Sequence, residues 1–370
     1  MSRPTVVMAT GGSGGHIYPA VAVAEVLHAG GYTPLFIGSA TGMEATLVPE
    51  AGFEFAGVPA GKWHRGRLEM RELLHAWRGL LAARRILRQR RPLAVAGFGG
   101  FASFPALAAA AWQRLPIVLH EQNVYPGLVT RWFAPRAAAV GLASADARIH
   151  LRRAKRIVEV GLPIREFRIP RFDARSALGL PQDSVVTLVM GGSQGSHALN
   201  SHVPEAYRRL PSELKENLYV LHACGRRWEG TLAPPGPSYR LQGFIDAPTA
   251  WSAADLAITR SGMGTIFEAA FHGVPLIMVP LPSAADDHQY HNAVATERAG
   301  GGRVVTEANL DSLATVWGEL LGAGTRRRAG SAIASQASTG AATEFAQLLI
   351  EVATRACKRD VAPAAQRELS

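Results

Sequence analysis

The chain has 370 residues, of which 48% are hydrophobic and 18% are charged, and its formal net charge is +10. This length predicts two domains, because a single hydrophobic core usually stops growing near about 250–300 residues. The composition excludes an intrinsically disordered chain, and Gly, Pro or charged residues interrupt every apolar run before it reaches the ~20 residues that cross a bilayer.

Short apolar runs alternate with longer helix-compatible stretches, and the alternation occurs in two successive halves of the chain. This pattern predicts an α/β fold with parallel sheets. In the first half, the expected strands are residues 4–10, 34–38, 54–58, 93–97, 116–120, 137–142 and 157–160. In the second half, they are residues 185–190, 218–222, 239–242, 255–259, 275–280 and 303–305.

A stretch that contains Gly161 and three nearby prolines separates the halves, so we expect a hinge near residues 161–170. The last strong helical stretch covers about residues 326–357, and the polar residues 358–370 are expected to form a poorly ordered tail. We therefore expect a first domain, a second domain, and a C-terminal helix and tail that packs back on the first domain, at residues 1–162, 163–345 and 346–370.

Gly-rich turns follow three of the expected strands, at residues 10–16, 97–101 and 190–196. Such turns let backbone N–H groups approach an anion, although they also occur simply as tight strand-to-helix turns. The second strand ends in Gly38-Ser39 without an acid, which disfavours an NAD enzyme, and the third turn lacks the lysine of a P-loop. We expect a phosphate-bearing ligand at the carboxyl edges of both sheets.

The positive charge is concentrated in residues 62–91, which contain ten basic and two acidic residues and have a net charge of +8. Helical spacing relates the apolar residues of this segment: Met70, Leu73, Leu74, Trp77, Leu80 and Leu81. Arg71, His75 and Arg78 mark another face. The segment is typical of a helix that lies on an anionic bilayer, and equally of a helix packed on a sheet. No nucleic-acid-binding motif is present.

Six motifs occur in one order over roughly residues 5–350: Gly11-Gly12-Ser13-Gly14-Gly15-His16-Ile17-Tyr18-Pro19, Gly97-Phe98-Gly99-Gly100-Phe101, His120-Glu121-Gln122-Asn123, Gly161-Leu162-Pro163-Ile164-Arg165, Gly191-Gly192-Ser193-Gln194-Gly195 and Asp287-His288-Gln289-Tyr290-His291-Asn292-Ala293. This ordered set resembles the MurG family of GT-B glycosyltransferases. The resemblance implies two Rossmann-like domains with parallel sheets that face a central cleft.

It also implies an inverting enzyme that transfers N-acetylglucosamine from UDP-N-acetylglucosamine (UDP-GlcNAc) to the C4 hydroxyl of the muramoyl sugar of lipid I, in peptidoglycan synthesis. Lipid I is embedded in a membrane, so the resemblance favours contact of the basic segment with the anionic cytoplasmic face of the inner membrane. The absence of a signal peptide and of paired cysteines agrees with a cytoplasmic location.

By resemblance, the donor-binding residues would be Ser13, Gly14, Gly15, Asn123, Arg165, Ser193, Ile245, Met263, Gly264, Thr265, Ile266, Phe267, Glu268, Gln289 and Asn292. The residues at the acceptor and its diphosphate would be Gly99, Gly100 and Phe101. Those in contact with the membrane would be Trp63, Arg71, Leu73, Leu74, Trp77, Arg78, Leu80 and Leu81. Two departures from the family stand out, Phe101 in place of Tyr and the run Met263-Gly264-Thr265.

His16 is the candidate general base, because neutral imidazole is available near pH 7; the alternative is that it caps a helix or donates to phosphate. Glu268 falls in an expected early helical turn, where an acid either accepts from ribose hydroxyls or stabilises the helix dipole.

We expect no cofactor and no metal for the transfer, because the chain has no Asp-x-Asp motif. The acids and histidines of residues 286–291 are more typical of a hydrogen-bonding loop than of a metal site. Two other functions remain open: a UDP-GlcNAc 2-epimerase or soluble-acceptor transferase, and, without catalysis, a basic nucleic-acid-binding protein.

Overall fold

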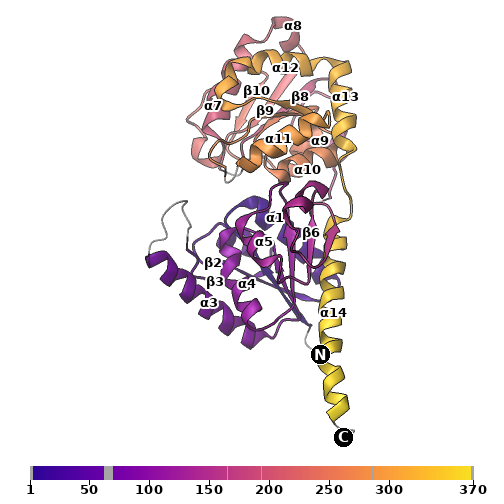
Figure 1. Ribbon diagram of the computed structural model, residues 1–370. Helices are drawn as coiled ribbons and strands as arrows, with labels where there is room; N and C mark the ends of the chain where they lie inside the picture. The colour runs from indigo at the N-terminus through magenta and orange to yellow at the C-terminus, as the bar shows by residue number, and fades with distance from the viewer. Residues whose placement is uncertain (1–2, 62–69, 165, 193, 285–286, 368–370) are drawn as a thin grey trace. The chain divides into compact units, whose positions relative to one another are not determined.

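The computed structural model describes residues 3–61, 70–164, 166–192, 194–284 and 287–367. The chain forms two compact units. Unit 1 contains residues 1–165 together with 340–370, and unit 2 contains residues 166–339 (Figure 1). The chain therefore leaves unit 1 within the segment expected to be a hinge and returns to it after residue 339.

Unit 1 is built on a parallel sheet whose seven described strands have the order β3-β2-β1-β4-β5-β6-β7. The strands are β1 Thr5–Ala9, β2 Thr33–Ser39, β3 Glu54–Val58, β4 Val95–Gly97, β5 Ile117–Glu121, β6 Ala139–Leu142 and β7 Ile157–Glu159. In the central register, Val7 lies between Leu35 and Val95.

Helices cover both faces of this sheet, as expected for apolar parallel strands. They are α1 Gly14–Ala29, α2 Glu44–Glu50, α3 Met70–Arg90, η1 Phe101–Ser103, α4 Phe104–Trp112, α5 Leu128–Phe133, η2 Ala145–His150 and α14 Ala341–Arg367. Successive residues of β1 point to opposite faces: Val6 and Met8 pack with α1 and α14, whereas Val7 and Ala9 pack with α3, α4 and α5. The C-terminal helix thus completes the core of unit 1.

Unit 2 repeats the architecture with a six-stranded parallel sheet in the order β10-β9-β8-β11-β12-β13. The strands are β8 Val185–Met190, β9 Leu218–Ala223, β10 Tyr239–Gln242, β11 Leu256–Thr259, β12 Leu276–Met278 and β13 Gly302–Val304. The helices are α6 Arg171–Ala177, α7 His197–Arg209, α8 Ser212–Lys215, η3 Arg226–Trp228, α9 Ala247–Ala253, α10 Met263–His272, α11 His288–Arg298, η5 Glu307–Ser312, α12 Leu313–Leu321 and α13 Ala323–Ala334.

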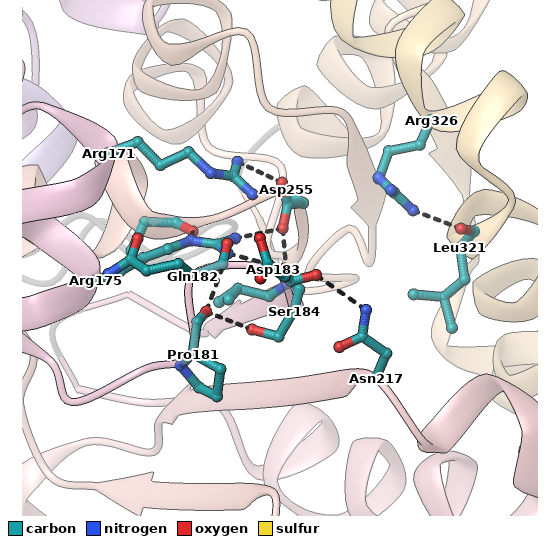
Figure 2. Close-up of polar contacts among 12 residues, drawn as sticks. Arg171, Arg175, Pro181, Gln182, Asp183, Ser184, Asn217, Asp255, Leu321 and Arg326 are labelled. Carbon is teal, nitrogen blue, oxygen red and sulfur yellow. Dashed lines mark hydrogen bonds and ion pairs between the residues drawn. The ribbon is translucent and has the colours of Figure 1, made fainter.

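A buried arginine fastens the first helix of unit 2 to its sheet (Figure 2). The side chain of Arg175 is fully buried and pairs with Asp255, with 2.7 Å between Nη2 and Oδ2. The same carboxylate accepts from the backbone N–H of Val186, on β8. Nη1 of Arg175 donates to three carbonyls of the turn between α6 and β8, those of Pro181, Gln182 and Ser184. A buried charge is tolerated here because it is paired and its donors are satisfied.

Every predicted strand is present, with ends that lie within two residues of the expected ones. The single helix expected over about residues 326–357 is wrong: α13 ends at Ala334 and α14 begins at Ala341. The intervening Ser, Thr and Gly residues favour a turn, and Gly340 has φ +80°. Helix α14 extends to Arg367, through most of the residues that were expected to form the tail, and the poor order of these residues stays a prediction. Among the described helices, none is long and apolar enough to cross a bilayer.

Candidate functional site

Each sheet has one point at which the strand order reverses, between β1 and β4 in unit 1 and between β8 and β11 in unit 2. Open α/β sheets bind ligands outside the carboxyl ends of the strands at such switch points. The predicted Gly-rich turns follow β1, β4 and β8, so the structure places all three at these two positions.

In unit 1, the turn after β1 leads directly into α1, whose third residue is His16. Ser13, at the N-cap, lies with its Oγ 2.8 Å from Nδ1 of His16. The hydroxyl of Thr10 donates to the carbonyl of His16 at 2.8 Å. The imidazole is therefore held from both its ring and its backbone. The structure thus identifies Ser13 as a partner of the His16 ring, which the sequence analysis did not predict.

The turn after β4 lies against this histidine. Gly99 and Gly100 have φ of +78° and +73°, a conformation that favours glycine. A Cβ at Gly99 would lie 3.1 Å from Cδ2 of His16, and one at Gly100 would clash with the carbonyl oxygen of Gly11. The two predicted turns are thus in direct contact. Phe101 follows them and stacks on Phe104, with ring centroids 5.8 Å apart.

A buried carboxylate that the sequence analysis missed supports the first turn. Glu44, at the start of α2, accepts from the backbone N–H of Gly12 at 3.1 Å and from that of Ser39 at 2.8 Å. The sequence has no acid at the end of β2, but Glu44, five residues after Ser39, places its carboxylate there. The sequence signal was weak, because Glu44 is an ordinary first-turn acid of a short helix.

At the end of β5, Glu121 organises the turn that carries Asn123. Its Oε1 accepts from the backbone and the side-chain amide of Asn123 at 3.0 and 3.3 Å, and its Oε2 accepts from the N–H of Gly127 at 3.1 Å. Burial raises the pKa of Glu121, and these hydrogen bonds oppose the rise. Gln122 donates to the carbonyl of Phe98 at 2.8 Å and so joins this turn to the one after β4.

His120 belongs to the core and not to the turns. It is fully buried, packs edge-on against Phe345 of α14 with centroids 5.1 Å apart, and donates from Nε2 to the carbonyl of Gly161 at 2.9 Å. Burial lowers its pKa to about 4, so the ring is neutral at pH 7. Its role is to anchor the end of β5 to the chain after β7.

In unit 2, the turn after β8 contacts the turn after β9. Gly195 has φ +71°, and a Cβ there would clash with the carbonyl of Cys224. A Cβ at Gly225 would lie 2.6 Å from the carbonyl oxygen of Gln194. Ser196 caps α7 by accepting from the N–H of Leu199. Ser193 and Arg165, both predicted donor ligands, lie outside the described residues.

A chain of buried hydrogen bonds supports the contact between the turns after β8 and β9. Asn200 donates to the carbonyl of Cys224 at 3.0 Å, and its Oδ1 lies 3.0 Å from Nε2 of His222. Nδ1 of His222 lies 2.7 Å from the hydroxyl of Tyr239. Burial lowers the pKa of His222 to about 4, which keeps it neutral. The sequence analysis named none of these residues, because a polar core network has no local sequence signature.

The start of α10 offers backbone rather than side chains. Gly262 is the N-cap, and Met263 and Ile266 turn into the core with 8% and 3% exposure. Gly264 has open space around it, and Thr265 and Phe267 are half-buried. The orphan N–H groups of this helix end can therefore serve a negative group. Ile245 is likewise buried, at 6% exposure.

Glu268 is the sixth residue of α10, and the first turn of the helix contains no acid. The expectation of an early-turn position is therefore wrong, and with it the helix-dipole alternative. Glu268 accepts from Nε1 of Trp251 at 3.0 Å. Desolvation raises its pKa to about 7, and the tryptophan bond opposes the rise. The residue still keeps intermediate solvent exposure. It is a partly accessible carboxyl that titrates near neutrality.

Gln289 and Asn292 of α11 both tie neighbouring turns together. Oε1 of Gln289 accepts from the N–H of Leu281 at 3.0 Å, and its carbonyl accepts from the hydroxyl of Ser261 at 2.8 Å. Asn292 is 1% exposed and donates to the carbonyl of Ser261 at 3.3 Å. Its Oδ1 is buried without a hydrogen-bond partner. Contact of these amides with a sugar stays a prediction.

Helix α3 has two apolar stripes rather than the single one expected. Ala76, Ala83 and Leu87 are buried, and Leu80 is half-buried against the same core. Leu74, Trp77 and Leu81 are 48%, 51% and 43% exposed. Leu80 therefore does not share the exposed stripe. Trp63 and the side chains of Arg71 and Leu73 lie outside the described residues.

A second tryptophan extends the exposed stripe. Trp112, at the end of α4, is 49% exposed and lies 6.1 Å from Trp77 between ring centroids. The guanidinium of Arg84 lies 4.3 Å from the Trp112 ring. We call Leu74, Trp77, Leu81 and Trp112 the α3–α4 patch. The sequence analysis missed Trp112 because it is distant in the chain from the basic segment.

In the described part of the chain, no three His, Cys, Asp or Glu side chains are grouped as a metal site would require. Asp287 precedes α11 in the left-handed conformation, with φ +50°, and His291 is exposed.

Comparisons with known proteins identify both units. Residues 6–142 match the glycosyltransferase family 28 N-terminal domain, and residues 186–348 match the family's C-terminal domain. The chain is 46% identical to the UDP-N-acetylglucosamine--N-acetylmuramyl-(pentapeptide) pyrophosphoryl-undecaprenol N-acetylglucosamine transferase of Deinococcus radiodurans, over 95% of this chain and 96% of that one. The enzyme of the same name from Thermus thermophilus is 40% identical, over 93% and 98%. The crystal structure of Acinetobacter baumannii MurG superposes with a TM-score of 0.76 at 27% identity, over 94% of this chain and 99% of that one.

Proposed function

Because the chain belongs to the MurG family of GT-B glycosyltransferases, we propose that it transfers N-acetylglucosamine from UDP-GlcNAc to lipid I and so forms lipid II. The protein is a UDP-GlcNAc-dependent N-acetylglucosaminyltransferase of peptidoglycan synthesis. The observation that carries this conclusion is 46% identity to a relative of that name over nearly the whole of both chains.

The reaction joins one proton transfer to one displacement. The C4 hydroxyl of the muramoyl sugar loses its proton to a base, and its oxygen forms a bond to C1 of the donor sugar. The bond from C1 to the diphosphate oxygen breaks, and UDP leaves with the electron pair. Attack from the face opposite the leaving group gives a β-1,4 link. The chain must therefore supply a base and stabilise charge on the diphosphate.

We assign the base to His16. Its Nδ1 lies 2.8 Å from Oγ of Ser13, and the tautomer in which Nδ1–H donates to that oxygen makes Nε2 the nitrogen that accepts a proton. The Gly-rich turn after β4 lies against the ring and leaves no Cβ beside it, which allows an acceptor sugar to approach closely. The predicted donor contacts of Ser13, Gly14, Gly15 and Asn123 remain part of this proposal.

We assign nucleotide binding to unit 2. Its glycine turn after β8, the N-cap of α7 and the N-terminus of α10 provide backbone donors for phosphates, with Ser193 and Arg165 as additional ligands. We also assign Glu268 as the acceptor for ribose hydroxyls, and the backbone of Ile245 as the contact for the uracil. These donors carry the developing charge without a metal.

We further propose that the α3–α4 patch docks the enzyme on the anionic cytoplasmic face of the inner membrane. Two exposed tryptophans beside exposed leucines and Arg78 combine the residues that prefer a lipid–water interface with positive charge. The arginine-rich end of α3 adds attraction to anionic headgroups.

The decisive assay incubates purified protein with labelled UDP-GlcNAc and a lipid I analogue, in parallel reactions with and without EDTA. We expect a labelled disaccharide-linked lipid and unchanged rates with EDTA. Conversion of UDP-GlcNAc without acceptor would support an epimerase instead, and inhibition by EDTA would contradict metal-independent transfer.

A further inference from the structure

The carboxylate of Glu44 is enclosed in unit 1, with no solvent exposure. Its two oxygens have different backbone partners: Oε1 accepts from Ser39 at the end of β2, and Oε2 accepts from Gly12 in the first Gly-rich turn. Hydrogen bonds from backbone N–H groups to an ionised acceptor are among the stronger ones in proteins. One side chain therefore ties the turn that carries Ser13 to the edge of the neighbouring strand.

Three glycines make room for this carboxylate. A Cβ at Gly38 would lie 2.8 Å from Cγ of Glu44, one at Gly42 would lie 2.5 Å from its Cδ, and one at Gly11 would clash with it. Glycine loses more backbone entropy on folding than other residues, so each of these three glycines lowers the stability of the fold relative to a residue with a side chain. The carboxylate therefore occupies a site that only glycines leave open.

The same carboxylate changes what the first turn can do. A Gly-rich turn before a helix ordinarily directs its N–H groups at a bound anion. Here the N–H of Gly12 is directed at Glu44, and a negative charge lies beside the turn. This arrangement suits a turn that holds side chains in place better than one that binds a phosphate.

The side chains held in place are those of Ser13 and His16, the proposed donor contact and the proposed base. Gly11 and Gly12, with φ of +145° and +87°, connect the Glu44 contact to Ser13. Ser13 in turn contacts His16, and the carbonyl of Gly11 lies against Gly100. A turn of successive glycines has no side chains to fix it, so an external anchor is required for precision.

We propose that Glu44 is a positioning residue for glycosyl transfer, which locks the first Gly-rich turn so that Ser13 holds His16 where it accepts the proton of the acceptor hydroxyl. This proposal rests on the assignment of His16 as the base. Misplacement of a reacting group by about 1 Å costs on the order of 100-fold in rate. Glu44→Gln turns an amide NH₂ toward one of the two N–H groups and displaces the turn.

The test compares kcat and KM in Glu44→Gln with those in Glu297→Gln. Glu297 of unit 2 also accepts from a backbone N–H, that of Val304 at 2.9 Å, and lies away from the turn. We expect kcat to fall about 10- to 100-fold in Glu44→Gln, with unchanged binding of UDP itself, which is assigned to unit 2, whereas Glu297→Gln keeps the wild-type kcat. Equal kcat in the two variants would overturn the proposal.

Gly42→Ala provides a second variant in case Glu44→Gln does not fold. Its backbone φ is not positive, so alanine is tolerated, but the added Cβ displaces the carboxylate and leaves Glu44 intact. We expect a similar loss of kcat. Wild-type kcat in a folded Gly42→Ala protein would contradict the positioning role.

A double-mutant cycle separates this proposal from the one on which it rests. If Glu44 acts through His16, Glu44→Gln has little further effect on kcat in the His16→Ala protein. Additive losses would overturn the role of Glu44 and leave the base assignment intact. Full activity of His16→Ala alone would remove the base assignment instead.

Discussion

Glu268 illustrates how one residue can be tuned by its surroundings. It lies against buried Trp251, and burial raises the pKa of its carboxyl to about 7, while its partly exposed side chain stays accessible to a ligand. A carboxylate accepts from ribose hydroxyls, whereas the protonated acid offers one acceptor fewer. Donor binding in this protein should therefore depend on pH in the physiological range.

We predict that the KM for UDP-GlcNAc falls as pH rises through about 7, because the carboxylate form of Glu268 becomes populated. Steady-state kinetics between about pH 6 and pH 8 would measure this. In Glu268→Gln, KM should be higher and should lose this pH dependence. An identical pH profile in the variant would show that another group titrates.

The same titration has a consequence for stability with the opposite sign. The folded-state pKa of Glu268 lies above the reference value of 4.5, so the folded chain binds this proton more tightly than the unfolded chain. The stabilisation of the folded state by the protonated Glu268 carboxyl is fully present below about pH 4.5 and is lost as pH rises through about 7. Denaturant unfolding across this pH range should show that the free energies of unfolding of the wild type and Glu268→Gln become more similar at acid pH.

His16 gives the sharper catalytic prediction. Replacement by Ala should lower kcat by about 100- to 10,000-fold, the usual contribution of a general base, with UDP binding by unit 2 retained. Ser13→Ala should have a smaller effect on kcat, because it removes the contact to Nδ1 but leaves the imidazole in place. Rapid-quench measurement of a single turnover would report the chemical step. A normal single-turnover rate in His16→Ala would assign the proton to another acceptor.

At the scale of elements, α3 shows both what sequence can predict and what it cannot. Periodicity correctly indicates an amphipathic helix, and strand positions follow from apolar runs because parallel strands are buried on both faces. Which leucines stay exposed depends on α4, the helix that packs beside α3. Periodicity alone therefore could not show that Leu80 is half-buried or that Trp112 lies beside Trp77. Periodicity in one helix contains no information about its neighbour.

The candidate site divides in the same way. Glycine turns at strand ends are visible in the sequence because their chemistry is local. The buried supports of those turns have partners that are distant in the chain: Glu44 lies 32 residues from Gly12, and Asn200 lies 22 residues from His222. Only the folded chain brings such residues together, since each is unremarkable within its own segment.

For the α3–α4 patch, we predict that replacing Leu74, Trp77 and Trp112 with Ser reduces sedimentation with phosphatidylglycerol vesicles at least about tenfold, because each large apolar side chain contributes roughly 1.5–3 kcal/mol when buried. The matched control replaces three apolar residues that are more exposed, Ile149, Phe167 and Phe172, at 63%, 61% and 65%. If vesicle sedimentation falls equally in both triple variants, the α3–α4 patch has no specific role in membrane binding. UDP binding should be unchanged in both.

At the scale of the molecule, unit 1 depends on a helix from the far end of the chain. Phe345 of α14 is fully buried and packs on Phe98 and His120, and Arg156 and Glu351 form two 3.0 Å contacts between the same helix and the segment before β7. The pair is partly exposed, so most of the stabilisation comes from apolar packing.

We predict that Phe345→Ala destabilises unit 1 by about 3–5 kcal/mol, the usual cost of removing a buried phenylalanine side chain. Hydrogen exchange read separately from peptides of the two units should show faster exchange in β4 and β5, with unit 2 unchanged. Phe172→Ala, at an exposed position, should leave both units as they are. Loss of protection throughout unit 2 would mean that the two units unfold together.

The return of the chain to unit 1 also sets an order of events on the ribosome. Residues 166–339 of unit 2 form a continuous segment, so this unit can finish folding while synthesis continues. Unit 1 has its strands first but receives α14 last, and until then the face of its sheet that carries Val6, Met8 and Phe98 lacks part of its cover. The strands of unit 1 are therefore translated before unit 2, but unit 1 is completed after it, and during that interval apolar residues of its sheet lack the cover of α14.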